Sequence, residues 1–174
     1  MIDLSTKNIY LIGPRASGKT TLGTRLAESL HCPFLDLDEE FRIRENRTIA
    51  DLVEKEGWDA FRAKEREILA DVHKTPGRVI ATGGGVVLDP ANRDLLIQGL
   101  TLYLQADPDT LAKRLASELL PEQRPNLTSL DLEEEIKQTL NEREPLYLRC
   151  SVANLPARPI DELVTMALKV VEMV

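Results

Sequence analysis

One glycine-rich stretch has the spacing of a site that binds phosphate groups. Gly13, Gly18, Lys19 and Thr20 match the pattern G-x-x-x-x-G-K-[ST]. In a loop of this kind, backbone N–H groups wrap the phosphates, the lysine adds positive charge at the β- and γ-phosphates, and the hydroxyl binds Mg²⁺. The helix that begins near Lys19 adds the positive end of its dipole. The sequence therefore predicts a site for a nucleoside triphosphate.

Two aspartates follow the next apolar segment. Asp36 and Asp38 alternate along the end of an expected strand, so one can lean toward a metal ion and the other toward the group that accepts the phosphate. Phosphoryl transfer mainly needs positioning, charge stabilisation and one carboxylate that takes the hydroxyl proton. Asp38 is the candidate for this base. The alternative is that both acids merely complement the dipole of a helix over 39–45.

Three arginines are candidates for binding anions. Arg62 and Glu65 lie three residues apart on a predicted helix, a spacing that most often gives a solvent-exposed ion pair. At the ligand edge of a sheet, however, Arg62 and Arg143 can each bind a carboxylate with two parallel hydrogen bonds. Arg124 lies in an irregular, proline-containing segment over 119–131. On a closing loop, it can stabilise the transferring phosphoryl group while water is excluded; the alternative is an ordinary exposed arginine.

The elements that must position these residues alternate between strand and helix. Apolar runs predict strands over 8–12, 33–38, 78–82, 100–104 and 151–155, with helical patterns between them. Such alternation predicts an α/β fold with a doubly wound, five-stranded parallel sheet, whose ligands bind beyond the carboxyl ends of the strands. We expect one domain over 1–174, with a mobile lid at about 116–131.

Several residues mark where the helices begin and end. Thr48 and Asp51 have the spacing of a capping box, and Gly57 is expected to stop the helix that they open. Asp59 can cap the next helix, and Pro145 is expected to bend or offset a later one. The run 83–85 is three glycines, which indicates a close approach of the backbone to another group.

Composition excludes several classes of protein. With 22 basic and 29 acidic residues, the net charge of −7 argues against nonspecific nucleic-acid binding. No apolar stretch approaches the ~20 residues that span a bilayer. The first residues lack the pattern of a signal peptide, and Cys32 and Cys150 do not form a disulfide framework, so we expect a cytoplasmic protein.

The motifs "LIGPRASGKTTLG", "FLDLD", "GWDAFRAKE", "ATGGG", "QRPNL" and "EREPLY" occur in an order and spacing that resemble the shikimate kinase family across nearly the whole chain. The resemblance implies a P-loop fold like that of nucleoside monophosphate kinases. It also implies transfer of the ATP γ-phosphate to the 3-hydroxyl of shikimate, in the chorismate pathway to aromatic amino acids. The expected ligands are ATP or ADP, Mg²⁺ and shikimate, and the expected state is a monomer.

The same resemblance implies a role for each matching residue. Lys19 and Arg124 are expected to act on the phosphates, with Asp38 as the base. Mg²⁺ is expected at Thr20 and Asp36. The residues expected to bind shikimate are Asp38, Arg62, Glu65, Gly83, Gly84, Gly85 and Arg143, with Glu65 either orienting Arg62 or touching the substrate. The residues expected to bind the nucleotide are Gly13, Pro14, Arg15, Ala16, Ser17, Gly18, Lys19, Thr20, Thr21, Arg114, Arg124 and Arg158.

Two alternative functions belong to other classes. Another metabolite kinase of the same fold, such as a gluconate kinase, also binds a carboxylate and hydroxyls. A noncatalytic nucleotide-binding module or switch is the second alternative. A GTPase of that kind would be expected to carry an N-K-x-D motif, which this sequence lacks. Motor-type ATPases usually have an acid at the end of a neighbouring strand, where this chain has Thr82 followed by glycines.

Overall fold

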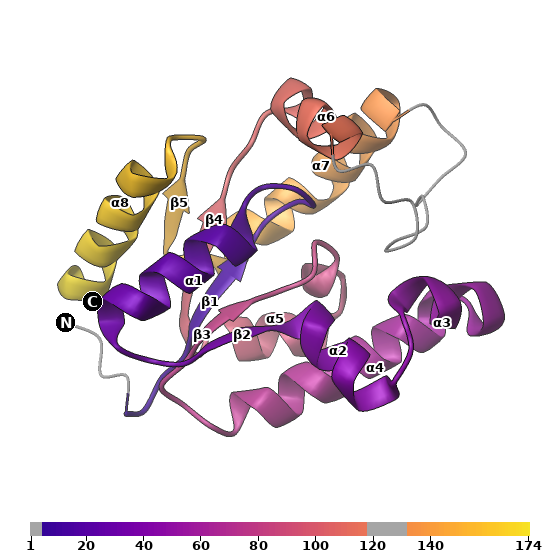
Figure 1. Ribbon diagram of the computed structural model, residues 1–174, viewed down its shortest axis with the longest axis horizontal. Coiled ribbons are helices and arrows are strands. Elements are labelled where there is room, and N and C mark those ends of the chain that lie inside the picture. Colours follow the sequence, from indigo (N-terminus) through magenta and orange to yellow (C-terminus); the bar gives the residue numbers. More distant parts are fainter. Residues whose placement is uncertain (1–4, 118–131) are drawn as a thin grey trace.

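The computed structural model describes residues 5–117 and 132–174 (Figure 1). Its described part contains one sheet of five strands in the order β2-β3-β1-β4-β5, and each neighbouring pair is parallel. The prediction of a five-stranded parallel sheet is therefore confirmed. The strands are β1 (Ile9–Ile12), β2 (Phe34–Asp36), β3 (Val79–Ala81), β4 (Leu100–Leu104) and β5 (Ala153–Leu155).

Helices cover both faces of this sheet. The elements are α1 (Lys19–Leu30), α2 (Leu37–Glu45), α3 (Ile49–Glu56), α4 (Trp58–His73), the 3₁₀ turn η1 (Val86–Leu88), α5 (Pro90–Leu96), α6 (Pro108–Ser117), α7 (Leu132–Cys150) and α8 (Ile160–Met173). Helices α1 and α8 pack against one face, whereas α4, α5 and α7 lie on the other (Figure 1). Both layers are needed because a parallel sheet buries its two faces.

The central strand β1 shows how the sequence builds these two layers. All four of its residues are fully buried, and successive side chains point to opposite faces. Ile9 and Leu11 pack into the cluster with α1 and α8, while Tyr10 and Ile12 pack into the cluster on the other side. The continuous apolar run therefore places the end of β1, and the glycine loop that follows it, at the middle of the sheet.

The boundary between β2 and α2 differs from the prediction. The strand ends at Asp36, whose carboxylate accepts a hydrogen bond from the backbone N–H of Asp38 at 2.9 Å. This bond makes Asp36 the N-cap of α2, so the helix begins at Leu37. Asp38 therefore lies in the first turn of a helix, and the expectation that both acids lie on the strand was wrong.

The other helix boundaries follow the sequence signals in part. Thr48 and Asp51 form the reciprocal capping box, and Gly57 ends α3 with a φ of 85°. Gly57 is also the N-cap of α4, so Asp59 lies inside the first turn and the expectation that it caps the helix was wrong. Helix α7 continues through Pro145. The proline therefore does not end it.

Most of the expected lid, and with it Arg124, falls at 118–131 and lies outside the described residues. Over residues 5–117 and 132–174, no helix combines the length and the apolar character needed to cross a bilayer.

Candidate active site

The phosphate-binding loop joins β1 to α1 through backbone conformations that favour glycine. Gly13 and Gly18 have φ angles of 145° and 97°, and Ala16 lies at 61°. A Cβ on Gly13 would lie 2.6 Å from the carbonyl oxygen of Leu104, so a side chain there would clash with the neighbouring strand. The loop therefore depends on glycine both for its turn and for its contact with β4.

Lys19, the first residue of α1, is bound to this loop. Its Nζ donates to the carbonyl oxygens of Gly13 and Pro14 at 3.0 and 2.7 Å, and to the hydroxyl of Ser17 at 3.3 Å. The side chain is buried. These bonds hold a positive charge next to the backbone that the sequence predicts to wrap the phosphates.

Thr20 and Asp36 bring two oxygen atoms together at the start of α1. The Thr20 hydroxyl donates to Oδ2 of Asp36 at 2.7 Å, while Oδ1 of Asp36 accepts from the N–H of Asp38. Mg²⁺ is usually bound by one or two protein oxygens together with phosphate oxygens and water. A hydroxyl and a carboxylate beside a phosphate-binding loop fit this ion.

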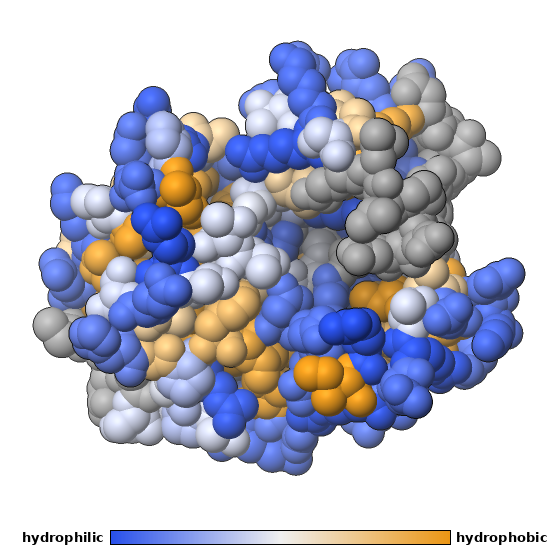
Figure 2. Space-filling view, in the orientation of Figure 1, coloured by the Kyte–Doolittle hydropathy of each residue, from blue (hydrophilic) through white to orange (hydrophobic). Residues whose placement is uncertain are grey.

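A cleft of about 580 Å³ lies over the loop. Arg114 on α6 donates from Nη1 to the carbonyl oxygen of Ala16 at 3.0 Å and thereby brings a cation to the loop. Arg158, which precedes α8, also lines the cleft. The face that carries α1 is hydrophilic over most of its area (Figure 2). Of the expected nucleotide-binding residues, those lining the cleft are Arg15, Ala16, Ser17, Gly18, Lys19, Thr20, Thr21, Arg114 and Arg158.

A second, smaller hollow lies next to the cleft. We call it the acceptor recess, and it has a volume of about 40 Å³. Among the described residues, Arg15 is shared between the linings of the cleft and the recess. The recess is lined by Arg15, Ile49, Trp58, Phe61, Arg62, Glu65, Gly83, Gly84, Gly85 and Arg143.

Arg62 and Glu65 form a largely buried ion pair in the wall of the recess. Nη1 of Arg62 lies 2.6 Å from Oε2 of Glu65, and the Glu65 side chain is only 4% exposed. The guanidinium also lies over the rings of Trp58 and Phe61. The common alternative, a solvent-exposed pair, is therefore wrong here.

Glu65 has hydrogen-bonding capacity that the protein leaves unused. Its Oε1 is buried and has no hydrogen-bond partner within the described part of the chain. Burial raises the pKa of Glu65, while the neighbouring Arg62 and Arg143 act in the opposite direction. An unpaired buried oxygen is costly. A hydroxyl donor from a ligand would relieve this cost.

The three glycines let the backbone approach these side chains. A Cβ on Gly83 would lie 2.7 Å from Oε1 of Glu65, and one on Gly85 would overlap the guanidinium of Arg62. The N–H groups of 83–85 donate no hydrogen bond to a backbone carbonyl of the described residues. The close backbone approach expected from the sequence is confirmed.

Asp38 and Arg143 reach this region from different helices. Asp38 lines the cleft, and its Oδ1 would lie 3.4 Å from a Cβ on Gly83, so the carboxylate lies between the cleft and the recess. Arg143 on α7 donates from Nη1 to the carbonyl of Gly84 at 3.2 Å. Its Nε is buried and has no partner among the described residues. This nitrogen is a donor that a ligand can use.

Tyr147 also contacts the glycine run, and sequence reasoning missed it. Its hydroxyl donates to the carbonyl of Gly84. The two residues are 63 positions apart. No local spacing pattern could have paired them.

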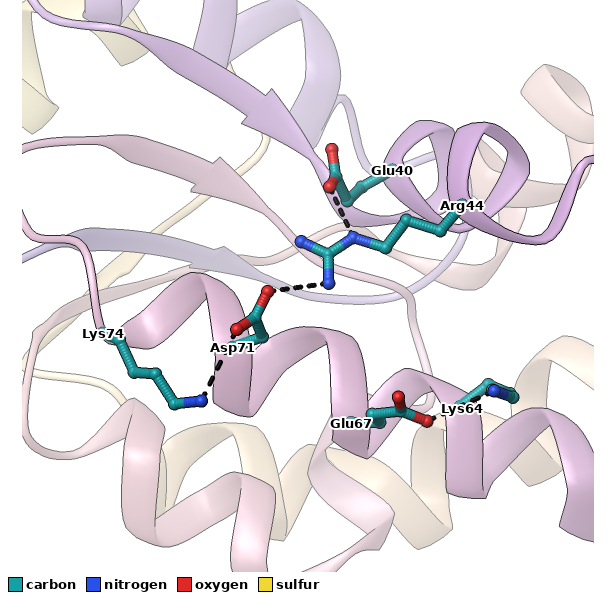
Figure 3. A network of polar contacts seen from close by, with 6 residues as sticks. All are labelled: Glu40, Arg44, Lys64, Glu67, Asp71 and Lys74. Atoms are coloured by element: carbon teal, nitrogen blue, oxygen red, sulfur yellow. Dashed lines mark hydrogen bonds and ion pairs between the residues drawn. The ribbon is translucent and has the colours of Figure 1, made fainter.

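Ion pairs fasten α2, which carries Asp38, to α4, which carries Arg62. Arg44 on α2 contacts Glu40 at 2.6 Å and reaches across to Asp71 on α4 at 2.8 Å (Figure 3). The Arg44 guanidinium holds the pKa of Asp71 below its usual value. The Arg44–Asp71 pair crosses between the two helices, and a partly exposed pair of this kind contributes little stability by itself.

A family model and the curated relatives of this chain agree on one family. The family model described as shikimate kinase matches residues 15–171. Shikimate kinase 2 of Enterobacter sp. (strain 638) is 46% identical over 145 residues, which are 82% of each chain. Shikimate kinase 2 of Escherichia coli O81 (strain ED1a) is 40% identical over 164 residues, with 91% of this chain and 94% of the relative covered.

Solved structures are similar over the whole fold. Shikimate kinase from Acinetobacter baumannii in complex with shikimate aligns with a TM-score of 0.90 and 32% identity, covering 98% of this chain and 95% of that one. A gluconokinase from Sinorhizobium meliloti aligns with a TM-score of 0.55 at 16% identity, covering 98% and 94%. The second likeness shows a common fold alone.

Proposed function

Because the chain belongs to the shikimate kinase family, we propose that it transfers the γ-phosphate of ATP to the 3-hydroxyl of shikimate, giving shikimate 3-phosphate and ADP. The observation that carries the proposal is the acceptor recess. It places Arg62, Arg143 and the unpaired oxygen of Glu65 directly beside a phosphate-binding cleft. Two arginines can bind the carboxylate of a ligand. The carboxylate of Glu65 and the backbone N–H groups can bind the hydroxyls of a ligand, so the recess fits a small hydroxylated acid.

The cleft binds the nucleotide in this proposal. The loop 13–18 wraps the phosphates with backbone N–H groups, and Lys19 moves its charge from the loop carbonyls to the β- and γ-phosphates. Thr20 and Asp36 hold Mg²⁺, which neutralises phosphate charge when it is bound. Arg114 and Arg158 line the part of the cleft that receives the rest of the nucleotide.

The recess holds the acceptor. Arg62 and Arg143 bind the carboxylate, and the N–H groups of 83–85 donate to the oxygens of the ring substituents. Glu65 keeps Arg62 in place and accepts from a hydroxyl through Oε1. Asp38, between the two hollows, takes the proton from the 3-hydroxyl as its oxygen attacks the γ-phosphorus.

The proposal extends to the domain, the assembly state and the lid. We expect residues 1–174 to form one kinase domain, and the enzyme to act as a cytoplasmic monomer. We also expect Arg124 to stabilise charge on the transferring group. This last expectation concerns a residue outside the described ranges.

A coupled assay of ADP release with Mg·ATP tests the proposal. Three reactions are compared, with shikimate, with gluconate and with no acceptor. We expect saturable ADP release with shikimate alone. Release with gluconate alone would keep the phosphate chemistry but replace the acceptor, and release that is absent or independent of acceptor would favour a noncatalytic nucleotide-binding module.

A further inference from the structure

The carbonyl group of Gly84 is held by two donors from one helix. The hydroxyl of Tyr147 and Nη1 of Arg143, both on α7, donate to the same oxygen, the latter at 3.2 Å. Arg143 also faces the acceptor recess, whereas Tyr147 does not line it. Tyr147 is fully buried. Its phenol therefore contacts the glycine run and the neighbouring Arg143 side chain rather than the ligand directly.

The ring of Tyr147 is itself fixed. It stacks on Tyr103 of β4 with ring centroids 4.9 Å apart and an interplanar angle of 27°. The hydroxyl of Tyr103 in turn donates to Oε1 of Glu144 at 3.1 Å, which joins β4 to α7 a second time. Burial raises the pKa of Tyr147 to about 12, so its hydroxyl stays a neutral donor throughout any ordinary assay range.

Peptide geometry carries the effect of this bond into the recess. The described residues contain no cis peptide bond, so the C=O of Gly84 and the N–H of Gly85 point in opposite directions across one planar group. Holding the carbonyl toward α7 therefore directs the N–H of Gly85 away from α7. That N–H donates to no backbone carbonyl of the described residues, and Gly85 lines the recess beside Arg62.

We propose that Tyr147 is a positioning residue for the acceptor: it fixes the Gly84–Gly85 peptide so that the N–H of Gly85 is a preset donor to an acceptor oxygen. This inference rests on the proposed function, because it needs a hydroxylated acid in the recess. The benefit is preorganisation. A glycine run is otherwise flexible, and ordering it at the moment of binding would cost affinity.

A matched pair of variants separates positioning from stability. Tyr147→Phe removes the hydroxyl but keeps the stacked ring. Tyr10→Phe is the control, because Tyr10 is equally buried and its hydroxyl bonds to Nδ1 of His73 at 2.7 Å, with neither residue lining the recess. Both variants remove the hydroxyl of a fully buried tyrosine, and only Tyr147→Phe is expected to alter the acceptor site.

Shikimate binding is measured through Trp58. It is the one tryptophan of the chain and lines the recess, so its fluorescence reports directly on the ligand there. We expect Tyr147→Phe to raise the Kd for shikimate by about 5- to 10-fold, the loss of one net hydrogen bond, with the KM for ATP unchanged within twofold. Tyr10→Phe should change neither value.

The outcomes distinguish the two proposals. If the wild-type protein shows no fluorescence change with shikimate and no turnover, the proposed function fails. If the wild type binds shikimate and Tyr147→Phe binds it equally well, or loses shikimate and ATP affinity alike, the positioning role is wrong.

A second measurement covers the case in which Tyr147→Phe does not fold. Labelling with ¹⁵N-glycine gives nine backbone signals, and the signal of Gly85 is assigned by its loss in Gly85→Ala. In the wild type, saturating shikimate should shift the Gly85 signal strongly and leave that of Gly99, which lies before β4 and lines neither hollow, in place. An unmoved Gly85 signal would overturn the inference.

Discussion

The nucleotide cleft and the acceptor recess meet at Arg15, yet they are built from different groups. The cleft is formed around backbone: its loop turns through glycines, and Lys19 bonds to the loop carbonyls. The recess is formed around side chains, with a buried Arg62–Glu65 pair packed against glycines. The cleft is also far larger, at about 580 Å³ against about 40 Å³ for the recess.

This difference means that the cleft is suited to phosphates in general, whereas the recess is suited to one kind of acceptor. A loop of backbone N–H groups recognises phosphates whatever they are attached to, so it can serve many nucleotide-binding proteins. Buried, charged side chains with unused hydrogen-bonding atoms recognise only a ligand that supplies the missing hydrogen-bond partners. The gluconokinase fold shares the general scaffold at 16% identity. We therefore expect changes in the recess to alter the choice of acceptor while nucleotide binding is kept.

The largest effect is expected where the two regions meet. Asp38→Asn removes the proposed base but keeps the size of the side chain, so kcat should fall by about 10²- to 10⁴-fold while ADP affinity is retained. Glu39→Gln is the control, because Glu39 is the next residue along α2 and forms only an exposed pair with Arg42. Steady-state rates and ADP titration measure both variants. A kcat near that of the wild type would remove Asp38 from the role of base.

A smaller effect, confined to the recess, is expected for Arg143→Ala. The variant removes one proposed partner of the carboxylate, and loss of one partner of a buried charged pair typically costs ~2–5 kcal/mol, so the KM for shikimate should rise by ~30-fold or more. The KM for ATP should stay almost unchanged. Arg149→Ala, an exposed position on the same helix, should change neither constant. An equal loss of both substrates would contradict the separation of the two regions.

The smallest changes test the two kinds of glycine. Gly13→Ala puts a methyl group against the backbone of Leu104 at a strained φ, and this should lower stability by about 1–3 kcal/mol and weaken ATP binding. Gly85→Ala meets the end of the Arg62 side chain, which can move. It should raise the KM for shikimate by about 10-fold, because a methyl group there displaces the guanidinium that is proposed to bind the carboxylate. Thermal melts and steady-state kinetics of both variants test this difference. A loss of shikimate binding in Gly13→Ala and of ATP binding in Gly85→Ala would contradict the separation of the two regions.

The sequence predicted best those features that depend on neighbouring residues. The glycine loop, the capping box at Thr48 and the apolar strand β1 each follow from local backbone or burial requirements, and each is present. The resemblance to the shikimate kinase family implied that Asp36 and Thr20 lie together around Mg²⁺. The 2.7 Å bond between the two residues agrees with that placement.

Features that depend on tertiary packing were harder to predict. The spacing of Arg62 and Glu65 is the same for an exposed pair and a buried one, and only the packing of Phe61, Trp58 and the glycines decides between them. Asp38 was placed on a strand because its side chain alternates with that of Asp36. In the structure, the capping bond from Asp36 starts a helix at Leu37, one residue before Asp38.

The two arginines proposed to bind the carboxylate come from opposite halves of the sheet. Arg62 belongs to the crossover between β2 and β3, on one side of β1, and Arg143 belongs to the crossover between β4 and β5, on the other side. A carboxylate bound by both would brace the two halves of the sheet mechanically. At a free concentration of 100 times its Kd, such a ligand would add about 2.7 kcal/mol to the free energy of unfolding. Resistance of the enzyme to proteolysis would then rise and fall with the supply of its own acceptor.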